Sequence, residues 1–338
     1  MWEYSIGREK LQTFFVGPGL LCYNIGLITG REVTIMDRAF TWQIPPEEEG
    51  QEIRRFLRAR GFSRQCLIRL KKEADNVAVD GVPCFLTRTL QAGETLSVLL
   101  REESSSEKIL PADLPLHICY EDEDLIVLDK PAGMPIHPSM NQYNNSLANA
   151  LARYYAAQGG NFVFRCVNRL DRDTSGLTIV GKNLYAASVL SAMVMKRQIH
   201  REYRAIVRGQ IDPASGTIDM PLGRKPGSII ERVIDPVHGE RAVTHYRVLS
   251  ESNGHSLVAL ELETGRTHQI RIHMKYLGYP LIGDYLYNPD MEWIGRQALH
   301  SCRLTFPHPV SGQLLEFTSP LPEDMQNVLS GVRPPAIP

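Results

Sequence analysis

The sequence predicts an α+β protein, with a large domain built on a mixed, largely antiparallel sheet and a small α/β domain before it. After residue 115, short apolar runs typical of strands outnumber helical segments and are joined by short connections. Between residues 40 and 100, two short helical segments precede several strand-like runs. Residues 101–114 are polar, serine-rich and proline-ended, which is typical of a linker. We therefore expect an unassigned extension over 1–39, a small domain over 40–100, a linker over 101–114 and the main domain over 115–330.

Composition narrows the class of protein. The chain has 338 residues, of which 43% are hydrophobic and 22% charged, and its formal net charge is −1. These values are those of an ordinary globular protein, so a nucleic-acid partner would have to be held by local basic patches. The six cysteines are scattered without a CxxC pair, which argues against a disulfide framework and a zinc site. Reduced thiols and a cytoplasmic location are expected.

The run FFVGPGLLCYNIGLI near the start resembles a targeting segment only superficially. It is about 15 residues long, contains Gly-Pro-Gly and Asn24, and lacks a small-residue cleavage site. Nothing else approaches the length of a membrane span, so no membrane partner is expected. The first 35 residues show no clear pattern, and we expect a chain that starts at Met36 to fold and function normally.

Residues 41–72 predict two short helices. The run PPEEE at 45–49 suits the first turn of a helix, because acidic residues are favoured there by the helix dipole. Gly61 ends this helix, and Ser63 is a plausible N-cap for the second. Short strands with turns at Asp80-Gly81 and Ala92-Gly93 follow.

The helix pair carries one sign of charge. Its basic residues, with no acidic residue among them, are Arg54, Arg55, Arg58, Arg60, Arg64, Arg69, Lys71 and Lys72. A solvated helix face explains most charge runs of this kind. In an otherwise neutral chain, two adjacent basic helices favour phosphate binding instead, and Arg64, Arg69 and Lys71 are the expected nucleic-acid contacts.

A cluster of opposite charges marks the segment VNRLDRDTSGLTIV at 167–180, where Asp171 and Asp173 alternate with Arg169 and Arg172. A nearby guanidinium favours the charged form of a carboxylate, as a nucleophile requires. Two carboxylates at i and i+2 of a strand would lie about 7 Å apart, near the separation that inverting glycosidases use. A glycosidase and a purely structural turn are therefore alternatives to a nucleophilic site.

A second polar cluster lies in LETGRTHQIRIHM at 262–274. We interpret the stretch as extended, which would place Arg271 and His273 on one face and their apolar neighbours toward the core. His268 and His273 lack a third ligand and are expected to be hydrogen-bonding residues, not metal ligands.

Four spaced motifs resemble, in the same order, those of the RluA-type family of RNA pseudouridine synthases. They are KPAG at 130–133, NRLDRDTSG at 168–176, REYRA at 201–205 and TGRTHQIR at 264–271. Two positions depart from the family pattern: Asn168 stands in place of a histidine and Arg201 in place of the usual lysine. The resemblance covers about 115–325. Residues 40–100 resemble the S4 RNA-binding domain through Ser63-Arg64, VAVDG at 77–81 and LQAGE at 90–94.

The resemblance implies a pseudouridine synthase fold preceded by an S4-like domain, in an enzyme that isomerises specific uridines of structured RNA. It implies that Asp171 is the nucleophile, that Arg271 pairs with it and that Tyr203 stacks on the flipped-out base. Arg169 would help to hold the flipped-out nucleotide, and Arg266 would lie near its phosphates. The implied partner is RNA, with ribosomal RNA favoured over transfer RNA. No metal or organic cofactor is required, and a monomer is expected.

Further expectations concern neighbouring residues. Asp173 is expected to cap the Thr-Ser-Gly turn, and Lys130 to order the turn that carries its motif. An RNA-binding protein without catalysis is a further alternative, and Asn168 is the one feature in its favour. The flanking arginines favour a phosphate-bearing substrate over a glycosidase substrate.

Overall fold

The computed structural model describes residues 37–102, 106, 109–139, 143–160 and 162–334. The expected extension over 1–39, like the expectation about a start at Met36, lies almost entirely outside these residues. Residues 37–39 are described, and the first strand already begins at Arg38.

A four-stranded antiparallel sheet forms the N-terminal unit, in the order β1-β4-β2-β3. Its strands are β1 (Arg38–Gln43), β2 (Val77–Val79), β3 (Val82–Pro83) and β4 (Thr95–Leu100). Helices α1 (Ile53–Ala59) and α2 (Arg64–Leu70) share one buried cluster with this sheet. The turn predicted at Asp80-Gly81 is confirmed, since both residues have the positive φ (48° and 78°) of a tight hairpin.

The helix boundaries were predicted in part. The Ser63 side chain accepts a hydrogen bond from the Cys66 amide at 3.2 Å, so it is the N-cap of α2 as expected. The acidic run at 45–49 does not open α1. It forms the separate 3-10 turn η1 (Pro46–Glu48), and α1 starts only after Glu52. A second short turn, η2 (Ala74–Asn76), precedes β2.

The main sheet has nine strands, and its order confirms the predicted α+β class. Eight strands run β5-β6-β7-β14-β8-β13-β12-β9, and β15 pairs with β14. Every neighbouring pair is antiparallel except β7 and β14, which are parallel. The strands are β5 (Ile118–Glu121), β6 (Leu125–Lys130), β7 (Ser175–Gly181), β8 (His200–Arg208), β9 (Ser215–Asp219), β12 (Val243–Ser252), β13 (His255–Leu262), β14 (Leu299–Pro307) and β15 (Leu314–Thr318).

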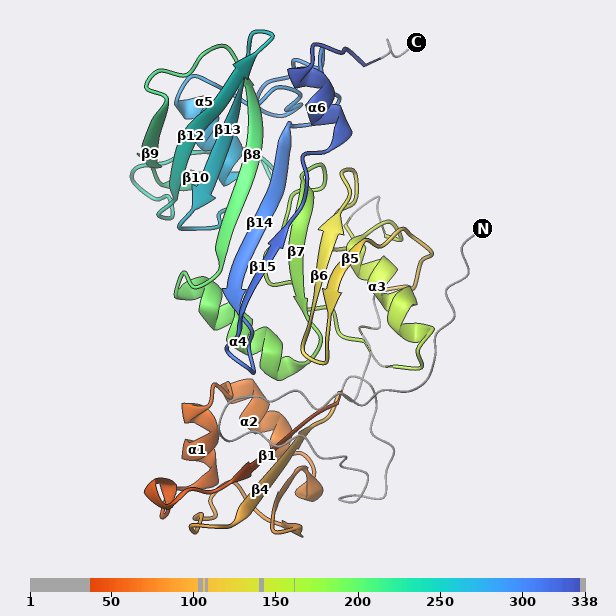
Figure 1. Ribbon diagram of the computed structural model, residues 1–338, viewed down its shortest axis with the longest axis vertical. Coiled ribbons are helices and arrows are strands. Elements are labelled where there is room, and N and C mark those ends of the chain that lie inside the picture. Colours follow the sequence, from red (N-terminus) through yellow and green to blue (C-terminus); the bar gives the residue numbers. More distant parts are fainter. Residues whose placement is uncertain (1–36, 103–105, 107–108, 140–142, 161, 335–338) are drawn as a thin grey trace.

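Helices cover this sheet and a hairpin flanks it (Figure 1). The helices are α3 (Leu147–Ala156), α4 (Leu184–Met195), α5 (Gln269–Tyr276) and α6 (Glu323–Leu329), and the hairpin joins β10 (Leu222–Arg224) to β11 (Arg232–Ile234). Ser146 and Asn149 form a capping box at the start of α3. None of the helices within the described ranges has the length and apolarity needed to cross a bilayer.

The expectation that 262–274 is extended is wrong, because Gln269–Tyr276 is the helix α5. Apolar and polar residues alternate at the start of α5, with Ile270 and Ile272 on either side of Arg271, because opposite sides of the helix are buried. Ile270 and Met274, four residues apart, join the cluster under β8 and β13, whereas Ile272 joins the cluster of the hairpin.

Helix α4 connects the two units, as it lies between them in Figure 1. Tyr185 packs into the core of the N-terminal unit, and its hydroxyl donates to the Arg60 carbonyl at 2.8 Å. Leu190 belongs instead to the core of the main sheet. One short helix thus contributes to both cores.

The candidate active site

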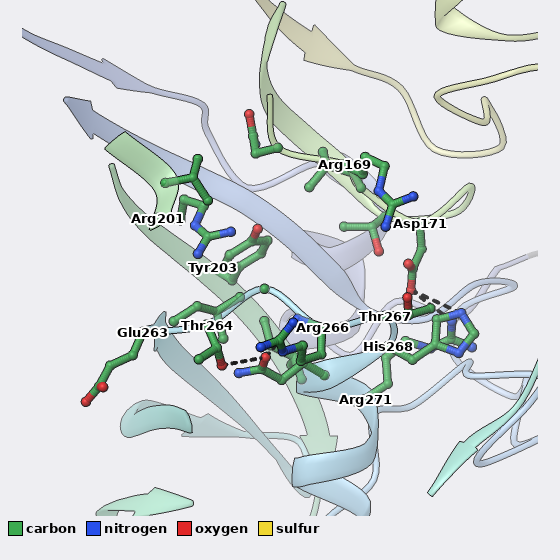
Figure 2. Close-up of a pocket in the computed structure, with 18 of the residues that line it drawn as sticks. Arg169, Asp171, Arg201, Tyr203, Glu263, Thr264, Arg266, Thr267, His268 and Arg271 are labelled. Atoms are coloured by element: carbon green, nitrogen blue, oxygen red, sulfur yellow. Dashed lines mark hydrogen bonds and ion pairs between the residues drawn. The ribbon is translucent and has the colours of Figure 1, made fainter. Parts of the chain in front are cut away.

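A cavity of about 840 Å³ opens between the loop that precedes β7, the C-terminal end of α4, the start of β8 and the turn that joins β13 to α5. Figure 2 shows the labelled side chains converging on it. Its lining is strongly basic, with two acidic residues, Asp171 and Glu263, and six arginines: Arg169, Arg197, Arg201, Arg241, Arg266 and Arg271. Such a lining favours a phosphate-bearing ligand.

The loop that carries Asp171 is fixed where β7 meets β14. Gly176 has φ +107°, and a Cβ there would lie 2.2 Å from the Ser301 carbonyl oxygen, so only glycine allows the two strands to approach this closely. Beside it, the Ser175 hydroxyl is hydrogen-bonded to His300 Nδ1 at 3.0 Å. The Thr-Ser-Gly of the motif is therefore the anchor of the loop.

Asn168 fastens the other end of the loop to β7. Its amide nitrogen donates to the Leu177 carbonyl at 3.2 Å, and its side-chain oxygen accepts from the Ile179 amide at 2.8 Å. The side chain is 3% exposed. Both hydrogen-bonding groups of the asparagine are used to orient the loop.

Lys130 joins the KPAG turn to the Asp171 loop, which agrees with the expectation that it orders the turn of its motif. It is fully buried at the end of β6, and its ammonium donates to the carbonyls of Pro131, Met134 and Arg172 at 2.8–2.9 Å. Burial lowers the pKa of Lys130 to about 7. The residue that follows Asp171 is thus held directly by the KPAG turn.

The structure brings Asp171 and Arg271 together. Arg271 Nη1 donates to Asp171 Oδ2 at 2.9 Å, while its Nε and Nη2 donate to the two carboxylate oxygens of Asp284 at 2.7 and 2.6 Å. The side chains of Arg271 and Asp284 are each 1% exposed, whereas that of Asp171 is 26% exposed and faces the cavity. Burial opposes the charged form of Arg271, but the two carboxylates more than offset this and raise its pKa. Asp284 was not predicted from the sequence, although it lies in the YPLIGDYLY stretch that resembles the family.

His268 approaches Asp171 from the start of α5, as Figure 2 shows. Its Nε2 lies 3.7 Å from Asp171 Oδ2, and its Nδ1 is 2.8 Å from the Tyr287 hydroxyl. That hydroxyl also accepts from the Arg232 amide at 2.9 Å, and it can donate to Nδ1 when the ring carries its proton on Nε2. Burial lowers the pKa of His268, and the charge of Asp171 opposes this. The expectation that His268 is a hydrogen-bonding residue is confirmed, and His273 likewise bonds to Thr244 and to a backbone carbonyl.

Tyr203 lies on the inner face of β8, 5% exposed, with its ring in the cavity wall. Burial raises the pKa of its phenol. Arg169 is exposed at the rim above Asp171 (Figure 2). Arg266 also lines the cavity, but its guanidinium is ion-paired with Glu240 and donates to the carbonyl of residue 241 at 3.1 Å.

Asp173 does not have the expected role as a cap of the turn. Its carboxylate is bound by the Arg172 guanidinium at 2.8–3.1 Å, and it lines a separate depression of about 510 Å³. The segment is a loop and not a strand, so the i, i+2 spacing does not place Asp171 and Asp173 on one face. This geometry removes the basis of the glycosidase alternative.

The basic helix pair is partly neutralised. Arg54, Arg60 and Arg69 form ion pairs with Glu52, Glu48 and Glu102 at 2.8, 2.6 and 3.3 Å. Arg64 and Lys71 are exposed and form no ion pair with any residue of the described ranges. The prediction of nucleic-acid contacts therefore rests on Arg64 and Lys71 more than on Arg69.

Within the part of the chain that the structure describes, Asp122, Asp124 and His308 are spaced closely enough to hold a metal ion. Their ligand atoms are already engaged, since His308 bonds to Asp122 at 2.8 Å and Arg38 binds Asp124 at 2.8 and 3.0 Å. None of the three lines the cavity. We interpret the group as an ion-pair network.

Comparisons with known proteins agree with this geometry. The family model described as RNA pseudouridylate synthase matches residues 124–276. The chain is 41% identical to the uncharacterized RNA pseudouridine synthase YjbO of Bacillus subtilis (strain 168) over 80% of this chain and 95% of that protein. It is 36% identical to the ribosomal large subunit pseudouridine synthase D of Xanthomonas campestris pv. campestris, over 80% of this chain and 85% of that protein. The solved structure of human RNA pseudouridylate synthase domain containing 1 superposes with a TM-score of 0.51 at 27% identity, covering 61% of this chain and 83% of that one. The chain belongs to the RluA-type family of RNA pseudouridine synthases and is an isomerase that acts on RNA.

Proposed function

We propose that this enzyme isomerises specific uridines of ribosomal RNA, with Asp171 as the nucleophile. One observation carries the proposal: the partly exposed carboxylate of Asp171 faces an arginine-lined cavity while a fully buried arginine holds it at 2.9 Å. A carboxylate held in this way is kept in place beside the cavity, as attack on the uridine requires. The similarity to a ribosomal large subunit pseudouridine synthase supports ribosomal RNA as the substrate.

In the proposed reaction the target uridine leaves the RNA helix and enters the cavity, because a stacked base is out of reach. Tyr203 stacks on the freed base, and Arg169 at the rim helps to hold the nucleotide. Asp171 forms a transient covalent bond to C6 of the base or to C1′ of the ribose, and the bond between N1 and C1′ breaks. The base then bonds to C1′ through C5, the bond to Asp171 breaks, and C5 gives up its proton while N1 takes one up. Arg271 holds the nucleophile in place through the hydrogen bond to Oδ2 at 2.9 Å, and Nε2 of His268 lies 3.7 Å from the same oxygen.

We further propose that residues 40–100 are an S4-like RNA-binding domain, that 115–330 form the catalytic domain and that 101–114 link them. Two helices on a small sheet with Ser63 as a cap support the first part, and the exposed Arg64 and Lys71 supply phosphate contacts. The proposed enzyme works in the cytoplasm as a monomer.

The test is to map pseudouridines across total RNA from cells with and without the gene. A site that disappears with the gene and returns with the wild-type copy, but not with Asp171→Asn, supports the proposal. Asp171→Asn keeps the shape and removes the charge, and misplacement or loss of a reacting group costs about a hundredfold or more in rate. Its RNA affinity should persist, because the arginines and lysines remain.

Asp173→Asn is the matched control, since this carboxylate pairs with an arginine outside the cavity. It should restore the site as wild type does. A map that does not depend on the gene, or full restoration by Asp171→Asn, would contradict the proposal.

A further inference from the structure

Arg201 lies in the cavity wall beside Tyr203. The two residues alternate along β8 and point to the same side, since residues i and i+2 of a strand share one face. Arg201 is 8% exposed, and Figure 2 shows its guanidinium next to the Tyr203 ring. A Cβ on Gly265 would lie 2.7 Å from Arg201 Nη1, so the guanidinium is seated directly over the glycine of the TGRT turn.

Among the residues that the structure describes, no carboxylate pairs with the buried guanidinium of Arg201. Its Nε makes no hydrogen bond, and no ion pair joins Arg201 to a residue within the described ranges. Glu263, two residues before Gly265 in the sequence and also in the cavity wall, is already bound by Arg197 at 2.6 Å, by His245 at 3.0 Å and by Arg241 at 3.5 Å. Burying a charge without a partner is costly. Because the unpaired guanidinium lies in the wall of a cavity, its free-energy cost indicates that a ligand supplies the missing anionic group.

We propose that Arg201 is the binding residue for a phosphodiester of the target nucleotide. The assignment rests on the proposed function, in which Tyr203 stacks on the base. Residues i and i+2 of a strand lie about 7 Å apart, a separation comparable with the reach from a base to the phosphate of its own nucleotide. A guanidinium binds phosphate oxygens through two parallel charge-assisted hydrogen bonds.

The other arginines of the wall are less suited to this role. Arg271 is bound to Asp171 and Asp284, Arg197 to Glu263, and Arg266 to Glu240. Arg201 is thus the one cavity arginine, among the described residues, that is both nine-tenths buried and unpaired.

The test compares the binding of uridine 5′-monophosphate and of uridine to the full chain by NMR titration. The wild type should prefer the monophosphate by about tenfold or more, as expected for a hydrogen bond to a charged group. Arg201→Met should lose this preference while uridine binding persists, and Arg201→Lys should retain part of it. Gly265→Ala should reduce it as well, because the added methyl group displaces the guanidinium without removing its charge.

Arg204→Met is the matched control, since Arg204 lies on the same strand but pairs with Glu202 and does not line the cavity. It should keep the wild-type preference. Arg201→Met should also resist urea at least as well as the wild type, because replacing a buried unpaired charge by an apolar chain relieves a cost. A merely structural arginine would give the opposite result.

Equal affinity of the wild type for the two ligands, no saturable binding of the monophosphate, or an undiminished preference in Arg201→Met would overturn the assignment. The readout does not depend on turnover. If no pseudouridine depends on the gene but Arg201→Met loses the preference, the phosphate site stands and the proposed function fails. If the gene is required for a pseudouridine but the preference survives in Arg201→Met, the proposed function stands and the phosphate site fails.

Discussion

Replacing Arg271 by methionine would separate its role in folding from its role in turnover. The guanidinium makes three hydrogen bonds, two to Asp284 and one to Asp171. In Arg271→Met the carboxylate of Asp284, 1% exposed, is left buried without a cation. Removing one partner of such a buried pair costs about 3–5 kcal/mol. The free energy of unfolding should fall by this amount, and turnover should fall by about a hundredfold or more because the nucleophile loses its positioning partner.

The double variant Arg271→Met with Asp284→Asn removes both buried charges at once. Most of the lost stability should return, since the uncompensated carboxylate is gone. Turnover should stay low, because Asp171 still has no cation beside it. Urea denaturation measures the first quantity, and single-turnover pseudouridine formation on the mapped RNA measures the second.

Arg172→Met provides the control on the same loop. Arg172 is 47% exposed and pairs with Asp173, so its loss should cost less than about 1 kcal/mol. The reasoning would be refuted if the double variant regained wild-type turnover together with stability, because Arg271 would then act through the fold alone. A cost below 1 kcal/mol for Arg271→Met would refute the buried-pair account.

The double variant Arg64→Ala with Lys71→Ala should weaken RNA binding and flatten its salt dependence, as anisotropy titrations at several salt concentrations would show; an unchanged slope would contradict the RNA-binding assignment. Asn168→His should keep initial rates within about tenfold, a little over 1 kcal/mol of barrier; a several-hundredfold gain would identify Asn168 as a defect. Burial lowers the pKa of Lys130 to about 7, so between pH 7 and 9 the unfolded chain binds a proton that the folded amine has lost. This group should therefore raise the free energy of unfolding by up to about 1.4 kcal/mol per pH unit, and urea titrations of the wild type and Lys130→Gln should differ by that slope.

Local chemistry explains which elements of the fold could be predicted from the sequence. The cap at Ser63 and the hairpin at Asp80-Gly81 depend on residues within a few positions, and the structure confirms both. Helix α5 was mistaken for a strand because Ile270 and Ile272 contact different buried clusters, so alternation does not identify the backbone conformation. A pattern confined to one segment cannot show that both sides of a helix are covered.

The residues of the candidate site, like the elements of the fold, were predicted only in part. Asp171 and Arg271 were expected together because of the motif resemblance, and the structure places them 2.9 Å apart. Asp284 went unpredicted because nothing near it in the sequence shows which buried cation it meets. Arg201 was noted only as a departure from a pattern, and its unpaired state is visible only once β8 and the TGRT turn are side by side.

The position of β14 has a consequence for the newly made chain. All four motifs precede residue 272, and β7 and β8 become neighbours only through β14, at Leu299–Pro307. The anchor of the Asp171 loop, Gly176 against Ser301, needs that strand as well. A polypeptide still attached to the ribosome therefore contains all four motifs before it contains the strand that anchors the Asp171 loop. A fragment that ends before β14 would match the family in sequence and lack the strand that joins β7 to β8, so the site is completed only when the second-to-last strand of the main sheet has been synthesised.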